Sequence, residues 1–86
     1  MAYTQTTVGS AWPASATYTA SGTEELDIIN PSGGTMFFLV NATAPTIEPT
    51  EGSPIKARDH RAITLLDGEK LWVASMEESA TCTILY

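Results

Sequence analysis

Apolar and polar residues alternate over short runs of this chain, and a period of two residues is typical of half-buried β-strands. Leu26 and Ile28 flank Asp27 in one such run, and residues 80–86 place apolar side chains between threonines for most of their length. The run TMFFLV at residues 35–40 is apolar almost throughout and too short for a typical helix. We therefore expect it to be a central strand that is covered on both faces.

Turn-forming residues separate these runs. Asp67-Gly68 joins apolar-rich runs at residues 61–66 and 69–75, and this dipeptide favours the positive φ angles of a type I′ turn, so we predict a β-hairpin there. Residues 41–54 contain three prolines. Proline cannot donate a hydrogen bond to an interior ladder, which predicts a loop or an edge strand for that segment.

The chain is expected to form one domain over residues 1–86, because this length leaves no room for a second core. Residues 3–20 are rich in threonine, serine, alanine and tyrosine, which predicts extended structure interrupted at Pro13. An extended N-terminal arm over residues 1–20 is the alternative. About six strands without an amphipathic helix predict an all-β fold, a small antiparallel β-sandwich or barrel of jelly-roll-like type.

The composition is that of a folded domain, with 43% apolar residues, but covalent cross-links are missing. Cys82 is the single cysteine and His60 the single histidine, so an internal disulfide and the common zinc-ligand spacings are excluded. We expect no cofactor and no metal. Small domains often depend on subunit contacts, and we therefore expect a homo-oligomer, with a trimer as one closed form.

The net charge of −6 opposes attraction to phosphate backbones and anionic lipids, so neither nucleic acid nor a membrane is an expected partner. No signal-peptide pattern and no long apolar run is visible, which predicts synthesis in the cytoplasm. All four lysines and arginines follow residue 55, whereas residues 1–55 contain five acidic residues and no basic one. The charge is therefore lopsided along the chain.

Motifs of catalysis are missing from the sequence: it has no glycine-rich nucleotide loop and no nucleophile elbow. The paired carboxylates at residues 24–25 and 77–78 lie beside predicted turns, where solvated charge is expected. We expect no catalytic residue and no enzymatic activity.

A cluster of basic residues is the first candidate interface. Lys56, Arg58, His60 and Arg61 fall within six positions and could dock on an acidic partner, including the acidic half of a neighbouring copy. An ordinary solvated loop is the alternative.

Two aromatic residues are the second candidate. Trp12, beside Pro13, and Tyr18 lie in a weakly patterned segment and could be interface anchors or a sugar-stacking platform. Core packing is the alternative interpretation for such residues.

Three segments resemble a known class of proteins: FFLVNATAPT (Phe37–Thr46), GSPI (Gly52–Ile55) and ITLLDGEKLWVAS (Ile63–Ser75). They are similar to small β-sandwich bacteriophage virion proteins, in which an apolar strand leads to an A-x-A-P-T loop, a Gly/Pro turn and a G-E-x-L-W hairpin. The resemblance covers residues 37–75, about half the chain. It implies a head decoration or cement protein, or a tail- or adaptor-associated piece.

The function expected from these observations is that of a noncatalytic virion structural protein. It would be made in the host cytoplasm and located in the virion, where it would bind coat protein, another virion protein or its own copies and stabilise the particle. A carbohydrate- or receptor-binding β module of a tail or fibre is the alternative. A small enzyme inhibitor is a third.

Overall fold

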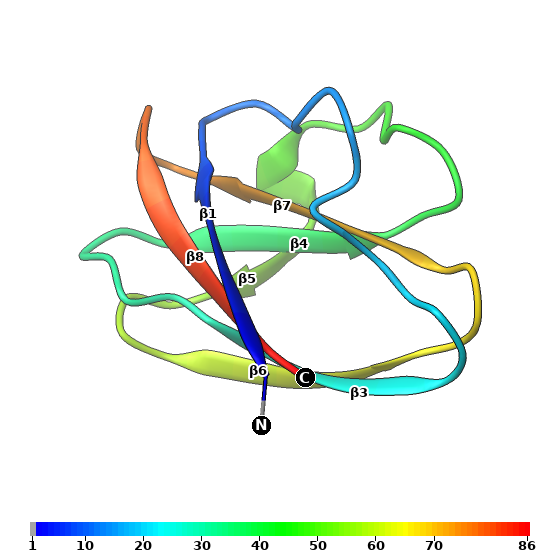
Figure 1. Ribbon diagram of the computed structural model, residues 1–86. Helices are drawn as coiled ribbons and strands as arrows, with labels where there is room; N and C mark the ends of the chain where they lie inside the picture. The colour runs from blue at the N-terminus through cyan, green and yellow to red at the C-terminus, as the bar shows by residue number, and fades with distance from the viewer. Residues whose placement is uncertain (1) are drawn as a thin grey trace.

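The computed structural model describes residues 2–86, which form eight strands and one turn of 3-10 helix (Figure 1). The strands are β1 (Tyr3–Val8), β2 (Tyr18–Thr19), β3 (Glu24–Ile29), β4 (Met36–Val40), β5 (Ser53–Ile55), β6 (His60–Leu65), β7 (Lys70–Ser75) and β8 (Ala80–Leu85), and the 3-10 turn η1 spans Pro49–Glu51.

The strands form two four-stranded antiparallel sheets packed face to face. Sheet A has the order β1-β8-β3-β6 and sheet B the order β2-β7-β4-β5, which is the strand order of a jelly roll. The chain is one long hairpin rolled up: β1 pairs with β8, β2 with β7, β3 with β6 and β4 with β5. The predicted fold class is confirmed, with eight strands instead of about six.

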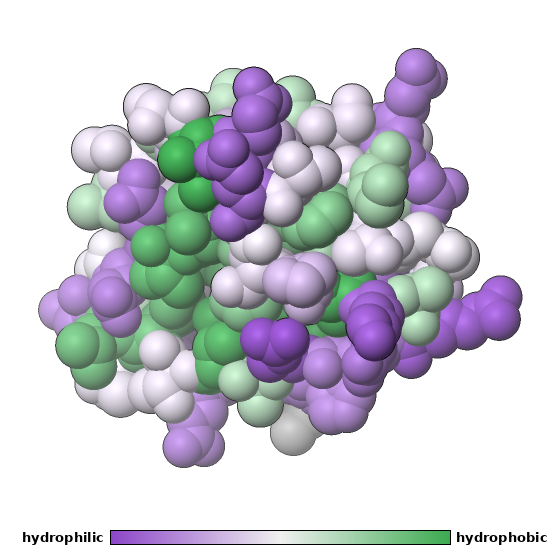
Figure 2. Space-filling view, turned by 180° about the vertical axis from the view of Figure 1, so that it is seen from behind, coloured by the Kyte–Doolittle hydropathy of each residue, from purple (hydrophilic) through white to green (hydrophobic). Residues whose placement is uncertain are grey.

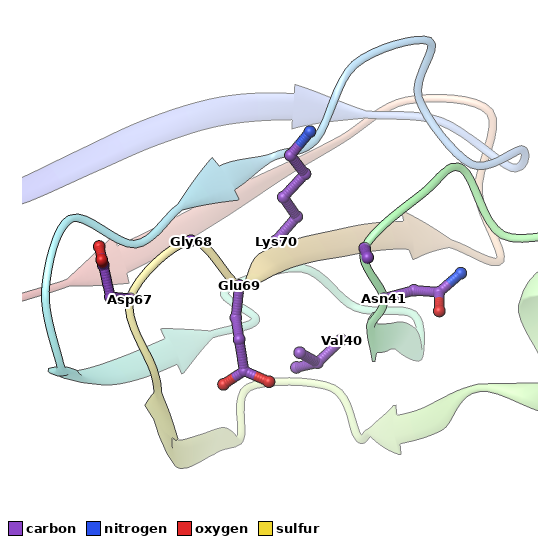
Figure 3. Close-up of a pocket in the computed structure, with 7 residues that line it drawn as sticks. Val40, Asn41, Asp67, Gly68, Glu69 and Lys70 are labelled. Carbon is purple, nitrogen blue, oxygen red and sulfur yellow. The ribbon is translucent and has the colours of Figure 1, made fainter.

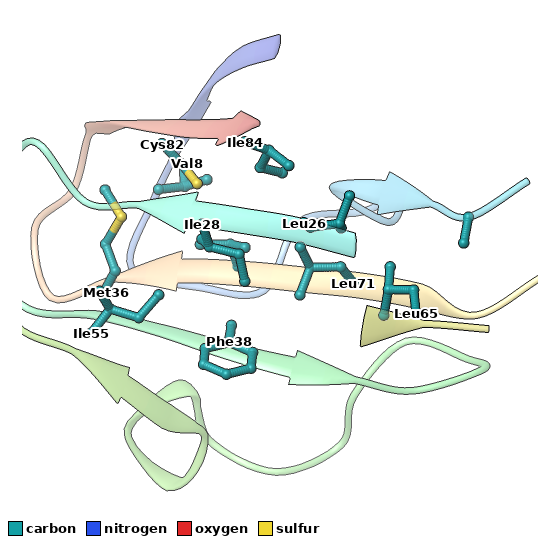
Figure 4. Packing of buried hydrophobic residues seen from close by; sticks show 12 residues of the cluster. Val8, Leu26, Ile28, Met36, Phe38, Ile55, Leu65, Leu71, Cys82 and Ile84 are labelled. Atoms are coloured by element: carbon teal, nitrogen blue, oxygen red, sulfur yellow. The ribbon is translucent and has the colours of Figure 1, made fainter. Parts of the chain in front are cut away.

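The core lies between the sheets and is supplied by alternate residues of the longer strands (Figure 4). Leu26 and Ile28 of β3 face Leu71 and Val73 of β7 across it, and none of these four side chains is more than 2% exposed. The predicted alternation around Asp27 is thereby confirmed. Burying such side chains contributes about 1.5–3 kcal/mol each.

Strand β4 lies between β7 and β5 and is covered on both faces, as expected from its apolar run. Met36 and Phe38 belong to the main core, whereas Phe37 is buried on the other face of sheet B. Trp72 of β7 also faces that side and is 4% exposed; its indole N–H donates to the Asn41 carbonyl at 2.9 Å. Connecting loops therefore cover the outer face of sheet B.

The predicted hairpin across Asp67-Gly68 is wrong, because β6 belongs to sheet A and β7 to sheet B. A turn does form, with the Glu69 N–H donating to the Leu66 carbonyl at 3.0 Å. Of the two central residues of this turn, Gly68 has a positive φ (+82°) and Asp67 does not, whereas a type I′ turn needs a positive φ at both. A turn of the unprimed kind splays the adjoining strands, which lets them enter different sheets.

One buried polar side chain ties the sheets together at the end of β3. Asn30 is fully buried, and its Nδ2 lies 2.7 Å from the Gly34 carbonyl, 3.0 Å from that of Ile55 and 3.1 Å from that of Lys56. Its Oδ1 accepts from the N–H and hydroxyl of Ser32. The side chain thus satisfies carbonyls at the end of β5 and just before β4.

The N-terminal segment is part of the sandwich. Residues 3–8 form β1 against β8 of the same chain, and the N–H groups of Ala2 and Tyr86 each donate to the other residue's carbonyl. In this structure residues 3–8 are an edge strand of sheet A. No helix formed by residues 2–86 has both the length and the apolar content to cross a membrane.

Candidate functional site

The basic cluster predicted from the sequence lies along the β5–β6 turn and the start of β6. The turn is closed by the Asp59 N–H, which donates to the Lys56 carbonyl at 3.1 Å. Arg58 sits at its tip with φ of +59°, a left-handed conformation that costs a residue other than glycine about 1 kcal/mol. Lys56, Arg58, His60 and Arg61 are all exposed. The side chains of His60 and Arg61 nevertheless leave opposite faces of β6, His60 towards Asp27 and Arg61 towards Pro54.

His60 is paired within the chain. Its Nδ1 lies 2.9 Å from Asp27 Oδ1 of the neighbouring strand, and the hydrogen bond to this carboxylate raises the pKa of His60, with the charge of Asp27 acting in the same direction. The pair lies on the outer face of sheet A and is exposed to solvent. Such surface pairs contribute little to stability.

Arg61 points from β6 towards sheet B. Its guanidinium donates to the Pro54 carbonyl at 3.1 Å and lies 5.6 Å from the centre of the Phe38 ring. It therefore covers the open side of the sandwich between β6 and β5, and a charged residue turned inward at an edge strand also discourages pairing with another chain.

The second half of the sequence, which carries all the lysines and arginines, lies beside the acidic first half in the fold. Because the rolled hairpin pairs the first half of the chain with the second, the basic start of β6 lies beside the end of β3, which carries Asp27. Among residues 2–86, the basic side chains without an ion pair or hydrogen bond are those of Lys56, Arg58 and Lys70, and the first two lie at one turn. A head-to-tail contact between a basic half and an acidic half thus has less geometric support than the sequence suggested.

The two aromatic candidates lie apart from the basic cluster. Trp12 is half-buried; its indole N–H donates to the Ile47 carbonyl at 2.8 Å, which pins the β1–β2 connection to the β4–β5 connection. Tyr18 in β2, at the opposite edge of sheet B from β5, donates to Glu24 Oε1 at 2.7 Å and packs against Tyr86. Burial and the Glu24 carboxylate raise the pKa of Tyr18 to about 12.

A hollow of about 350 Å³ lies beside Gly68 and has no aromatic residue in its lining (Figure 3). Its carboxylates are engaged locally: Asp67 accepts the Gly22 N–H at 2.8 Å and Glu69 accepts the Leu66 N–H at 2.6 Å. Lys70 points to the other side from Glu69 in Figure 3. These groups shape turns and do not converge on a common point.

Residues 2–86 contain no group of three histidine, cysteine or carboxylate side chains arranged to hold a metal ion. Cys82 is fully buried in the core, and burial raises the pKa of its thiol to about 11.

Figure 2 shows apolar residues forming a band on this face of the molecule, with hydrophilic residues on both sides of it.

The edges of the two sheets differ sharply, and sequence reasoning missed this feature. Sheet B ends in strands of two and three residues, and Pro54 lies in the second. Sheet A ends in β1 and β6, each six residues long. The signal available in the sequence was the uncharged, threonine-rich run YTQTTV, but its position at an edge follows only from the topology.

Comparison with known protein families, curated proteins and solved structures gives no match for this chain. The two-sheet sandwich is established by the structure itself, and the bacteriophage origin implied by the sequence resemblance has no support from a relative.

Proposed function

We propose that this chain is a noncatalytic structural subunit of a virion, a capsid decoration or cement protein that binds coat protein or its own copies and stabilises the particle. In this proposal it is made in the host cytoplasm and works by adhesion. The observation that carries the proposal is that sheet A, as residues 2–86 form it, ends in two six-residue strands, β1 and β6, whose outer edges pair with no other strand. Unpaired edges of this length are templates for pairing with another chain.

The fold adds support by analogy. Jelly rolls recur in viral capsid proteins and in lectins, so the same architecture agrees with the proposed role and with the carbohydrate-binding alternative. Because one fold serves many functions, the open edges of sheet A distinguish this role better than the fold does.

The surroundings of Trp12 favour the structural role over carbohydrate binding. A sugar-stacking platform needs an open aromatic face, whereas Trp12 is half-buried with its N–H engaged by Ile47. An ideal Cβ placed on Gly52 would lie 3.1 Å from the Trp12 ring, so the indole packs closely on that turn. The residue holds the β1–β2 connection against the β4–β5 connection.

The test is the composition of purified particles. Virions from the source culture would be banded on a density gradient and quantified by mass spectrometry, with the coat protein as reference. We expect the chain in a fixed ratio to coat protein, and a glycan array without hits. Absence of the protein from intact particles would contradict the proposal, and so would glycan binding that Trp12→Ala abolishes.

A further inference from the structure

We propose that β1 is the self-association surface of this protein, and that two copies join by pairing their β1 strands antiparallel about a two-fold axis at Gln5, which makes one eight-stranded sheet. This deepens the proposed function, since it rests on the chain being an assembly subunit and names the surface and the partner, a second copy.

The hydrogen-bonding pattern of β1 leaves a regular set of groups unused. Ala2 and Tyr86 exchange both of their main-chain hydrogen bonds, at 3.0 and 2.9 Å. Because bonded pairs alternate along an antiparallel ladder, Thr4, Thr6 and Val8 also bond to β8. The N–H and C=O groups of the residues between them therefore point away from β8, and no strand formed by residues 2–86 lies on that side. These residues are Tyr3, Gln5 and Thr7.

This set of groups is self-complementary. With Gln5 opposite Gln5 of a second copy, Tyr3 of each copy lies opposite Thr7 of the other, and all three residues fall in hydrogen-bonded positions. The register would form six main-chain hydrogen bonds. On the inner face it places Thr4 opposite Thr6, and such threonine pairs favour strand pairing. Two-fold contacts of this kind are the commonest in homo-oligomers.

Of the four edge strands formed by residues 2–86, β1 alone carries no feature that protects against pairing. Strand β2 has two residues, β5 contains Pro54, and β6 carries the inward-turned Arg61. Residues 2–20 contain no charged side chain, although the chain has a net charge of −6. Two copies can therefore bring β1 strands together without placing like charges in the contact.

The first experiment compares two proline variants by sedimentation velocity from micromolar to millimolar protein. Gln5→Pro removes an outward N–H from β1 without removing a bond to β8. Ala62→Pro is the matched control on β6, because the Ala62 N–H likewise points away from the neighbouring strand β3. We expect the wild type and Ala62→Pro to dimerise and Gln5→Pro to remain monomeric. A monomeric wild type, a dimeric Gln5→Pro, or loss of the dimer in Ala62→Pro alone would overturn the proposal.

The second experiment tests the register and keeps the proposal falsifiable if Gln5→Pro fails to fold, as judged by circular dichroism. Gln5→Lys and Gln5→Glu each place like charges opposite one another, which should weaken the homodimer up to about fivefold. An equimolar mixture should form the heterodimer in preference to either homodimer. The same pair of changes at Thr64 of β6 is the control. Equal behaviour of the two sites would overturn the proposal.

Salt separates this contact from docking through the basic cluster. A contact without charges between two copies of net charge −6 should tighten as salt screens their repulsion, whereas docking of Lys56 and Arg58 on acidic residues should weaken. Weakening in salt would overturn the β1 contact. If the wild type remained monomeric while purified particles contained it, this inference would fail and the proposed function would stand.

Discussion

Removing the side chain of Asn30 should be the most damaging single truncation of a polar residue in this protein. Asn30 is fully buried and its amide nitrogen lies within hydrogen-bonding distance of three carbonyls, including the buried carbonyl of Ile55. A hydrogen bond contributes about 1 kcal/mol net, and leaving a buried carbonyl without a partner costs about 1–3 kcal/mol. Asn30→Ala should therefore lower the free energy of unfolding by about 3–5 kcal/mol.

That loss is large on the scale of the molecule. A domain of 86 residues has a free energy of unfolding of about 4–13 kcal/mol, and each 1 kcal/mol lost lowers Tm by about 4–8 °C. Asn30→Ala should therefore unfold at least about 12 °C below the wild type.

The assay is urea unfolding followed by tryptophan fluorescence, with the dependence on urea compared between variants. Asn41→Ala is the matched control, because Asn41 is exposed and its side chain donates one hydrogen bond, to the Thr43 carbonyl at 2.9 Å. It should change the free energy of unfolding by less than about 0.5 kcal/mol. A loss below about 1 kcal/mol for Asn30→Ala, with unchanged urea dependence, would refute the idea that this side chain ties the sheets together.

Three further predictions concern single groups. The NMR titration of His60 should give a pKa above 6.5 that falls towards 6.5 in Asp27→Asn. Since the pKa of His60 is raised in the folded state, the stabilisation by the pair is present below pH 6.5 and is lost as pH rises through the folded pKa. An identical titration in Asp27→Asn would contradict the pairing. Cys82 should react with a thiol reagent no faster than the protein unfolds, because its thiol is buried with a pKa of about 11; rapid modification of the native protein would count against this core position. Gly68→Ala should lower the free energy of unfolding by about 1–2 kcal/mol through its φ of +82° alone, since the added Cβ would meet nothing within 4 Å. Gly33→Ala is the control, because that position is equally unobstructed and has no positive φ. Equal losses for the two variants would contradict the backbone explanation.

The sequence predicted the strands that carry a clear pattern and missed those that are too short to show one. Alternation around Asp27 identified β3, and the apolar run at residues 35–40 identified β4. Strands β2 and β5 have two and three residues, too few to show a pattern, and they are defined by pairing with β7 and β4. The Asp67-Gly68 turn was located correctly, but which turn type forms depends on the sheets that the chain must reach.

The candidate site shows the same division between local and tertiary information. The basic cluster is contiguous in the chain, so its grouping could be predicted. The pairing of His60 with Asp27, and the inward turn of Arg61, depend on strand register and could not. The open edge at β1 depends on the order of strands in sheet A, which no local pattern encodes.

The claim that this protein acts by adhesion through an open sheet edge is tested most directly by amide hydrogen exchange of β1 at several protein concentrations. The account predicts that the Thr6 amide, bonded to β8, is protected at every concentration, and that the Gln5 amide becomes protected only as concentration rises. The Ala62 amide on the other edge should not respond. A Gln5 amide that exchanges freely at millimolar protein, or one protected equally at micromolar protein, would contradict it.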